Sequence, residues 1–261
     1  SFKAEVFEDY FGTGESLGLD IEYVVEDEAL GTGGGIRNVY DRLRGDTTMV
    51  FNGDVLGGTD LTGILQAHEA NNADVTLHLV QVGNPRAFGC VPTDATGRVL
   101  AFLEKTEDPP TNQINAGCYV FRRELIADIP AGRVVSVERE TFPKLLEDGY
   151  AVYGYVDNAY WRDMGTPGDF VRGSSDLVRG IAPSPLLVGR TGESLVDESA
   201  LVKDGTLLLG GTVIGRGTEV GAGCRLDDVV VFDGVTIEPG AVLEDSIIGH
   251  GVRIGANARI K

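Results

Sequence analysis

The sequence predicts two folded parts, an α/β domain with a mostly parallel sheet and, after it, a solenoid of triangular β-coils. Two patterns predict them. Short β-rich runs alternate with segments of helical spacing up to about residue 180, and an apolar residue recurs every six positions from Val196 onward. The 37 glycines among the 261 residues fit a chain with many tight turns, because glycine adopts turn conformations that cost other residues most.

Apolar, β-rich runs bounded by turn residues predict the strands of the first part, and helical spacing predicts the helices between them. Strands that alternate with helices favour a mostly parallel sheet that is covered on both faces. Ligands of such sheets bind beyond the carboxyl ends of the strands, where functional motifs are therefore expected. The expected strands are 20–25, 48–52, 73–82, 99–103 and 116–121, and the expected helices are 34–43, 61–71, 139–147 and 168–179.

The second part carries an internal repeat, in which an apolar residue recurs every six positions and a smaller residue stands four positions after it. A six-residue period fits neither the α-helix nor the alternation of a β-strand. It fits triangular coils, and it resembles the hexapeptide repeat of left-handed parallel β-helices. About four coils are expected, more than the roughly three repeats that a solenoid needs. The positions are Val196, Val202, Leu208, Ile214, Val220, Leu226, Phe232, Ile237, Leu243, Ile248, Ile254 and Ile260, with a phase slip before Ile237 and another before Ile248.

A Pro- and Ser-rich stretch at 181–186 predicts the boundary between a first domain at 1–180 and a second at 187–261. The formal charge of −18, from 22 basic and 40 acidic residues, excludes nucleic acid as an expected partner. The sequence has no apolar run long enough for a membrane span and no signal-like start, so a cytoplasmic protein without a membrane partner is expected. The three cysteines are far apart and are expected to be buried thiols.

The first motif is the glycine-rich run 29–35, which follows an expected strand and opens an expected helix. It has neither the lysine of a P-loop nor the spacing of G-x-G-x-x-G. Its backbone N–H groups could approach an anion or the edge of a base. An ordinary tight turn explains the same run equally well.

Three further motifs follow expected strands. Asp54, in the sequence N-G-D, is a candidate Mg²⁺ ligand, since Mg²⁺ is usually held by one or two carboxylates and by substrate phosphates. A turn aspartate that caps the next helix is the competing interpretation. Glu104 and Lys105 suit a sugar hydroxyl and a phosphate, or form a solvated surface pair. Asp163, in the sequence W-R-D-M-G-T, is a candidate second metal carboxylate.

Together and in this order, the motifs resemble the nucleotidyltransferase family that makes nucleotide-sugars from sugar 1-phosphates, which implies a Rossmann-like domain. The family pattern of L-G-T-x-G, G-D, F-G-x-V, F-x-E-K, N-A-G-x-Y-x-F and W-x-D-x-G-T-P is met here. The segment 136–143 resembles the S-I-E-x-x-x-F-P of the mannose-1-phosphate guanylyltransferase branch, which also carries a C-terminal left-handed β-helix. The matching residues are 30–33, 53–54, 88–91, 102–105, 115–121 and 161–167.

The resemblance implies an enzyme that transfers a nucleotidyl group from an NTP, with GTP expected, to a hexose 1-phosphate, with mannose 1-phosphate expected, and that releases pyrophosphate. Thymidylyl, uridylyl or adenylyl transfer to glucose 1-phosphate is the alternative within the family. Mg²⁺ is the implied cofactor. The implied residues are Asp54 and Asp163 for the metal and catalysis, Lys105 for the attacking phosphate oxygen, Gly89, Glu104 and Asn115 for the sugar, and Leu30, Gly31, Thr32 and Gly33 for the nucleotide.

The chain departs from the family pattern at one element. The family's G-G-x-G-T-R-L loop and P-K-P motif, which hold the triphosphate, have no counterpart in these residues. The resemblance begins instead in a helix expected to contain Phe2, Val6, Phe7, Tyr10 and Phe11. The numbering is therefore expected to cover part of a longer polypeptide, and the 261 residues alone are expected to be inactive.

Two other classes of function remain open. Left-handed β-helices also build acyltransferases, which commonly need a histidine base at a coil turn. His250 occupies such a turn, where a solvated surface residue is the competing interpretation, and His68 and His78 are expected to pack in a helix face and a strand. The other class is a non-catalytic regulatory subunit, which would retain the fold and lose the chemistry. The flat faces of the β-helix are an expected surface for a homo-oligomer.

Overall fold

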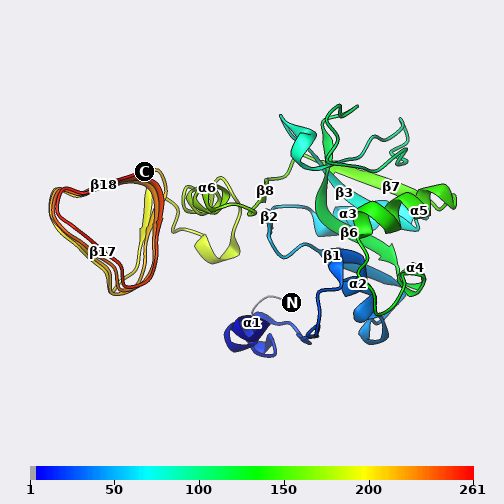
Figure 1. The fold of residues 1–261 in the computed structure, drawn as a ribbon, viewed down its shortest axis with the longest axis horizontal. Helices are drawn as coiled ribbons and strands as arrows, with labels where there is room; N and C mark the ends of the chain where they lie inside the picture. The colour runs from blue at the N-terminus through cyan, green and yellow to red at the C-terminus, as the bar shows by residue number, and fades with distance from the viewer. Residues whose placement is uncertain (1–3) are drawn as a thin grey trace. The chain divides into compact units, whose positions relative to one another are not determined.

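The computed structural model describes residues 4–261, and the chain divides into two compact units. The first unit comprises Ser1–Asn52 and Asp60–Asn158, and the second comprises Gly53–Thr59 and Ala159–Lys261. Figure 1 shows a sheet with helices in the first unit and stacked coils in the second. The expected N-terminal helix is α1 (Ala4–Phe11), and Phe2 lies outside the described residues.

The α/β fold class is confirmed for the first unit, but its sheet is mixed and not mostly parallel. The order is β5-β4-β6-β3-β7, with β1 also paired to β6. β1, β3 and β7 share one direction, as the alternation of strands and helices predicts, whereas β6 runs antiparallel to β1 and β3. β6 is reversed because the described segment 82–112, which leads to it from β3, holds short strands and no α-helix to return the chain along the sheet. The strands are β1 (Thr47–Phe51), β3 (Val75–Gln81), β4 (Gly89–Cys90), β5 (Leu103–Glu104), β6 (Gln113–Arg122) and β7 (Val152–Asp157).

Most of the expected helices are confirmed. They are α3 (Leu61–Ala70), α5 (Phe142–Glu147), which follows a π-helical turn, and α6 (Pro167–Val178) in the second unit. The helix expected at 34–43 is α2 (Gly31–Asn38) with a 3₁₀ turn after it, so it begins inside the glycine-rich run. A short helix, α4 (Arg123–Ala127), follows β6.

Two expected strands are wrong in whole or in part. Residues 20–25 form no strand, because none of the strands described in residues 4–261 pairs with them, and a β-rich run needs a neighbour to complete its ladder. Of the strand expected at 99–103, only Leu103 lies in one of the strands of the structure, β5. Composition alone therefore predicts a strand where pairing does not supply one.

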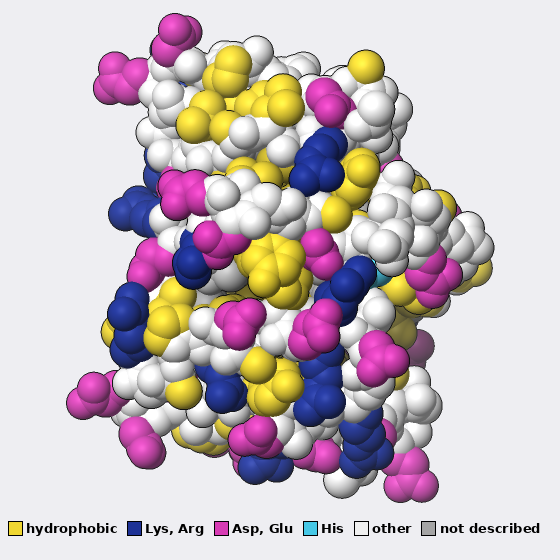
Figure 2. Space-filling model, turned by 90° about the vertical axis from the view of Figure 1, so that its right-hand side faces the viewer, with side chains coloured by type: hydrophobic (Ala, Val, Ile, Leu, Met, Phe, Trp, Pro, Cys, Tyr) yellow, Lys and Arg dark blue, Asp and Glu magenta, His cyan; other side chains and the backbone are white. Residues whose placement is uncertain are grey.

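The surface carries charges of both signs. Acidic and basic side chains are interspersed on the face shown in Figure 2. Some of these charges form ion pairs at the surface, for example Arg133 with Glu140 and Lys144 with Asp148. None of the helices within residues 4–261 is long and apolar enough to cross a membrane.

His68 and His78 are buried in the first unit, as expected. His68 is 5% exposed, and its Nδ1 lies 2.9 Å from Thr76 Oγ1. His78 Nε2 lies 3.0 Å from Asp157 Oδ1. Burial lowers the pKa of His68 below its ordinary 6.5, and the positive charge of Arg122 acts in the same direction.

The lowered pKa of His68 predicts a loss of stability in mild acid. The unfolded chain binds a proton at His68 before the folded chain does, so this contribution is complete above about pH 6.5 and is lost as the pH falls towards the folded-state pKa. We expect the free energy of unfolding in urea to fall more steeply between about pH 7 and about pH 5 in the wild type than in His68→Gln. Parallel slopes in the two proteins would contradict this assignment.

The second unit begins with β2 (Val55–Gly57), which pairs antiparallel with β8 (Trp161–Asp163). After α6 the chain forms a parallel β-helix, whose coils lie over one another on a triangular outline in Figure 1. Each coil pairs in register with the next, so the fold predicted from the repeat is confirmed. Its strands are β9 (Ser194–Val196), β10 (Leu201–Val202), β11 (Leu207–Leu209), β12 (Thr212–Ile214), β13 (Glu219–Val220), β14 (Arg225–Val231), β15 (Thr236–Ile237), β16 (Val242–Ile248), β17 (Arg253–Ile254) and β18 (Arg259–Ile260).

Burial follows the six-residue period with one correction. Ile214, Val220, Leu226, Ile237 and Leu243 are at most 1% exposed and form the core of the coils. At the position assigned to Phe232, the inward residue is Val231, and the Phe232 ring packs outside against Phe170 and His250. The first phase slip therefore precedes Val231 and not Ile237.

One corner of the coils varies in length. In β14 and β16 a single aspartate in the left-handed region forms it, Asp228 with φ 53° or Asp245 with φ 43°. In the first coil two residues, Gly210 and Gly211, occupy the same corner. The one-residue corner accounts for the two phase slips, since it shortens the spacing between inward residues from six to five.

Candidate functional site

Neighbouring strands of the second unit carry the two predicted metal carboxylates. Asp54 precedes β2, and Asp163 ends β8, where it pairs with Val55. The Met164 N–H donates to the Asp54 carbonyl oxygen at 2.9 Å, so the backbone of Asp54, in the turn before β2, is held beside the end of β8. Asp54 is exposed, and the half-buried Asp163 carboxylate lies near Gly165, where a Cβ would be 3.3 Å from Asp163 Oδ2. Two residues far apart in the sequence are thus neighbours.

Asp54 and Asp163 suit a Mg²⁺ site that other ligands complete. In residues 4–261, no group of three or more His, Cys, Asp or Glu side chains is placed to hold a metal. Mg²⁺ retains several waters and binds proteins through one or two carboxylates together with substrate phosphates. Asp54, just before β2, and Asp163, at the end of β8, could supply that donor set together with a bound phosphate.

Gly89, Glu104 and Lys105 meet at the pair of strands β4 and β5 in the first unit. Gly89 lies opposite Glu104, and a Cβ at Gly89 would be 2.9 Å from Glu104 Oε2. Glycine therefore leaves the space that the Glu104 carboxylate occupies. Lys105 is exposed and has φ 51°, which is uncommon for a residue with a side chain, and its N–H donates to the Phe88 oxygen at 3.2 Å. An acceptor for hydroxyls and a cation for phosphate thus stand side by side.

Asn115 borders a bulge of β6, which comprises residues 116–118. Pairing with β3 shifts register between Leu77 and Leu79, opposite this bulge. Asn115 Oδ1 accepts from the Gly117 N–H at 3.1 Å, and its Nδ2 donates to Tyr119 Oη at 2.8 Å. The amide group has two N–H donors, and the second could meet a sugar hydroxyl.

The bulge also brings β6 close to the end of β1. Gly117 has φ 76°, and a Cβ there would lie 2.9 Å from Asn52 Nδ2. The Asn52 N–H donates to the Gly117 oxygen at 2.7 Å. Gly117 therefore has to be glycine for Asn52 to pack against the bulge.

The glycine-rich first turn of α2 is bonded to the backbone of Val135. The Val135 oxygen accepts from Gly33 N–H at 2.9 Å and from Gly34 N–H at 3.4 Å, and the Val135 N–H donates to the Leu30 oxygen at 2.9 Å. Gly31 has φ 71°, and a Cβ there would be 2.6 Å from the Val135 oxygen. A protein carbonyl thus engages two N–H groups of this turn, while Gly31 and Thr32 face a cavity.

The cavity has a volume of about 610 Å³. Gly31 and Thr32 line it from the start of α2, and Asn52 and Tyr119 line it from the strands. It runs along β1 as far as Asn52, just past the carboxyl end of that strand, where α/β sheets bind ligands, and its volume is typical of small-molecule sites. Burial raises the pKa of Tyr119 far above its ordinary value, so its hydroxyl stays neutral beside Asn115.

Glu138 is a candidate residue to which the motifs assigned no role. Thr32 Oγ1 donates to Glu138 Oε2 at 2.8 Å, and Ser136 Oγ donates to the same oxygen at 2.8 Å. The Val137 N–H in turn donates to Thr32 Oγ1 at 2.9 Å. The π-helical turn Val137–Thr141 places these groups against the glycine-rich turn. The resemblance of 136–143 to a branch motif was the available signal, but a spacing does not reveal which loop the carboxylate meets.

The cysteines are buried, as expected. Burial, with a smaller effect of the Asp157 charge, raises the pKa of the Cys118 thiol to about 11. The thiolate is the nucleophilic form of cysteine. Cys118 therefore packs in the interior as a neutral thiol.

The predicted residues fall into two groups by unit. The exposed His250 also lies in the second unit, where its ring stacks on Phe232 with centroids 4.8 Å apart. Asn52 is in the first unit and Gly53 in the second, so the N-G-D motif joins them. The first unit carries Leu30, Gly31, Thr32, Gly33, Gly89, Glu104, Lys105 and Asn115, and the second carries Asp54 and Asp163.

Comparison with known families and proteins gives matches to both parts. The nucleotidyl transferase model matches residues 1–180, and the GMPPB C-terminal domain model matches residues 190–261. The chain is 69% identical over 201 residues to the mannose-1-phosphate guanylyltransferase of Mycobacterium tuberculosis, with 77% of this chain and 56% of that protein covered. It is 38% identical over 260 residues to the mannose-1-phosphate guanyltransferase of Yarrowia lipolytica, with 95% of this chain and 70% of that protein covered. The chain thus spans little more than half the length of the first relative.

Solved structures give a similar result. The crystal structure of HddC from Yersinia pseudotuberculosis superposes with a TM-score of 0.57 at 26% identity, with 65% of this chain and 72% of that chain covered. The same protein complexed with GMP-PN superposes with a TM-score of 0.56 at the same identity and coverage.

Proposed function

The chain belongs to the nucleotidyl transferase family, and we propose that the full-length protein transfers GMP from GTP to mannose 1-phosphate and releases pyrophosphate. A phosphate oxygen of the sugar forms a bond to the α-phosphorus of GTP, while the bond from that phosphorus to the bridging oxygen of pyrophosphate breaks. The observation that carries the proposal is the 69% identity to a mannose-1-phosphate guanylyltransferase. The HddC complex with GMP-PN supports a nucleotide of this kind.

The side chains of the first unit would bind and orient the two substrates. Lys105, an exposed cation at a strained turn, would hold the sugar phosphate in line with the α-phosphorus. Glu104 and Asn115 would bond the sugar hydroxyls. Gly31 and Thr32, which line the cavity, would contact the nucleoside. Positioning and charge stabilisation are the main demands of such a transfer.

Asp54 and Asp163 would hold Mg²⁺ in the second unit. The bound ion supplies positive charge that neutralises the phosphate oxygens. The two aspartates supply carboxylate oxygens, the ligand type that Mg²⁺ prefers, and leave coordination positions for phosphate and water. The positions of their backbones support this role, because Asp163 pairs with Val55 and the Met164 N–H donates to the Asp54 oxygen.

Pyrophosphate release by the full-length protein tests the proposed function. The assay uses Mg²⁺, four NTPs and two hexose 1-phosphates, mannose and glucose. We expect turnover with GTP and mannose 1-phosphate above all other pairs. Turnover confined to another pair would keep the family and replace the substrates, and no turnover with any pair would remove the proposal.

Acetyl-CoA binding distinguishes the proposed function from the acyltransferase alternative. A hexapeptide-repeat acyltransferase would bind acetyl-CoA, which the proposed enzyme does not need. The candidate base of such an acyltransferase, His250, stacks on Phe232 in an exposed turn. A surface residue without a catalytic role can adopt the same arrangement. Absence of turnover together with acetyl-CoA binding would favour that function.

Thr32→Val tests the proposed nucleotide site. The change keeps the side-chain shape but leaves the Val137 N–H and the Glu138 carboxylate without their shared partner, which loosens the turn. We expect the KM for GTP to rise by about tenfold, with the KM for mannose 1-phosphate nearly unchanged. Thr191→Val, at an exposed position of the second unit, is the control. Equal effects on both substrates would argue against a nucleotide-specific role.

A further inference from the structure

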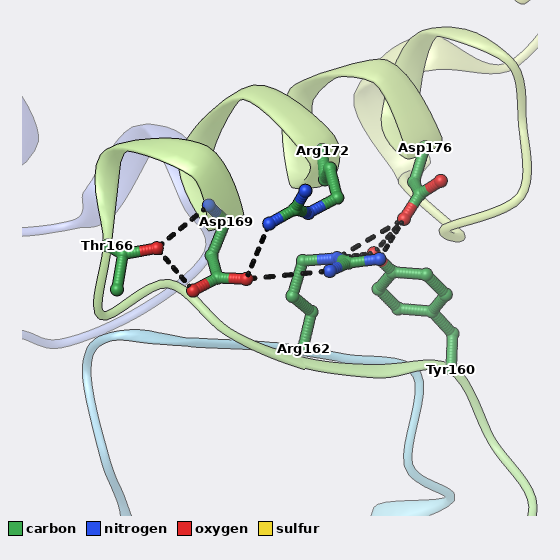
Figure 3. A network of polar contacts seen from close by, with 6 residues as sticks. All are labelled: Tyr160, Arg162, Thr166, Asp169, Arg172 and Asp176. Carbon is green, nitrogen blue, oxygen red and sulfur yellow. Dashed lines mark hydrogen bonds and ion pairs between the residues drawn. The ribbon is translucent and has the colours of Figure 1, made fainter. Parts of the chain in front are cut away.

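Arg162 precedes Asp163 on β8 and fastens this strand to α6 (Figure 3). Its Nη2 donates to Asp176 Oδ2 at 3.0 Å, and its Nε donates to the same oxygen at 3.3 Å. Tyr160 Oη donates to that oxygen at 2.6 Å and accepts from Arg162 Nε at 3.0 Å. Arg162 Nη1 also lies 3.7 Å from Asp169 Oδ1. One arginine thus spans two carboxylates that lie two turns apart on one face of the helix.

The start of α6 is held by the same group of residues. Thr166 Oγ1 accepts from the Asp169 N–H at 3.1 Å and donates to Asp169 Oδ2 at 2.5 Å. Arg172 Nη2 approaches Asp169 Oδ1 at 4.0 Å. Asp169 therefore joins the helix cap to Arg162, and the connection from β8 to α6 is fixed at both ends.

The residues on either side of the candidate metal ligand Asp163 are the ones that contact α6. Successive side chains of a strand point to opposite faces, so Arg162 and Met164 share the face towards α6 and Asp163 points away from it. Met164 packs where a Cβ at Gly173 of α6 would lie only 2.6 Å from its sulfur. The contacts of Arg162 and Met164 with α6 therefore hold β8 on both sides of Asp163.

The opposite side of α6 is anchored to the first coil. Ser175 Oγ donates to the Gly210 oxygen, and a Cβ at Gly211 would lie 2.6 Å from Ser175 Cα. The helix also contacts β12, β14 and β16. The Phe170 ring lies 6.3 Å from the Phe232 ring. A continuous packed route thus runs from the coils through α6 to β8.

We propose that Arg162 is a positioning residue, which with Tyr160 and Asp176 holds the backbone of Asp163 to the β-helix and so sets the placement of Asp163 beside Asp54. The side chains of Arg162 and Asp176 are 28% and 16% exposed, so water screens their attraction less than at the surface. Hydrogen bonds between charged partners are stronger than neutral ones. The role of Asp163 as a metal ligand rests on the proposed function, whereas the fastening of β8 does not.

Hydrogen exchange of the metal-free protein tests the fastening first. In Asp176→Asn, we expect the amides of β2 and β8, among them the Met164 N–H that bonds Asp54, to exchange about tenfold faster, with the coils unchanged. Glu238→Gln is the matched control, because it removes one negative charge from an ion pair with Arg253 on the coils. Equal exchange of β8 in wild type and Asp176→Asn would overturn the proposal, whatever reaction the protein catalyses.

Metal binding tests the consequence. In Asp176→Asn, we expect Mn²⁺ affinity by electron paramagnetic resonance, and the Mg²⁺ concentration for half-maximal velocity, to weaken about tenfold, with the KM values of both substrates within about twofold. Arg162→Lys retains the positive charge but lacks the several N–H donors of the guanidinium group. Its metal affinity should lie between those of the wild type and Asp176→Asn. If Asp176→Asn does not fold, Tyr160→Phe removes one bond to the same oxygen and should shift metal affinity in the same direction. Unchanged metal affinity despite faster exchange would overturn the link to Asp163, and a wild type without turnover would reject the function alone.

Discussion

Asp163→Asn in the full-length protein is expected to lower kcat for pyrophosphate release by about 10³-fold. The substitution keeps the size of the side chain and removes one of the two carboxylates that would hold Mg²⁺ against the phosphates. The loss corresponds to about 4 kcal/mol of transition-state stabilisation. The fold should persist, because Asp163 is half-buried and its backbone remains paired with Val55. Steady-state kinetics at saturating Mg²⁺, with a thermal melt of each variant, measure both quantities.

The controls for this prediction separate charge from position. Asp204→Asn removes the same charge from an exposed coil turn and should leave kcat unchanged. Asp54→Asn should resemble Asp163→Asn, and the double variant should lose little more than either single one, because both act on one ion. Retention of more than about a tenth of wild-type kcat in Asp163→Asn would exclude it from the role of metal ligand.

Leu226→Ala is expected to lower the free energy of unfolding of the second unit by about 3 kcal/mol. Leu226 is fully buried inside a middle coil, and in-register strands lie on both sides of it. The coils above and below cannot close the cavity without breaking their ladders, so its cost adds to the lost burial. Urea unfolding, followed by a probe of the second unit, measures the change.

The control for this prediction lies on the same β-helix. Leu201 is 52% exposed on β10, so Leu201→Ala should cost less than about 0.5 kcal/mol. Similar losses in the two variants would mean that burial inside the coils does not dominate stability. A weaker dependence of the unfolding free energy on urea concentration in Leu226→Ala would indicate that the second unit of this variant is already partly unfolded before the main transition.

The β-helix could be predicted from the sequence because each inward position is set by local spacing. Ile214, Val220 and Leu226 are buried at the predicted interval. The interpretation failed at Phe232, because residues 229–232 are all apolar and offer no contrast between inside and outside. The inward choice of Val231 follows from the one-residue corner at Asp228, which depends on backbone conformation.

The sheet of the first unit was harder to predict because strand direction is a long-range property. The runs at 48–52, 73–82 and 116–121 were identified correctly as strands. Their composition is the same in parallel and antiparallel ladders, so the reversal of β6 left no local trace. The run 20–25 failed for the same reason, since its residues favour a strand but pairing decides whether one forms.

The candidate site was predictable as motifs and not as contacts. The ordered motifs selected Asp54 and Asp163, whose backbones the structure places side by side where β2 meets β8, although their roles stay predictions. The bonds of the glycine-rich turn to Val135 and of Thr32 to Glu138 join segments more than a hundred residues apart. Arg162 was overlooked because its partners lie on the following helix, and only the packing of β8 against that helix reveals them.

The two-glycine corner of the first coil has a consequence for insertions and deletions in this sequence. At this corner the ladder opposes Gly210 and Gly211 to Asp228 alone, so the first coil is one residue longer than the next. Deletion of one codon there would give the first coil the length of its neighbour and keep every inward residue in phase. It would also remove part of the seat of Ser175, and with it the anchor of α6. Repeat regularity and helix docking thus make opposite demands on one codon.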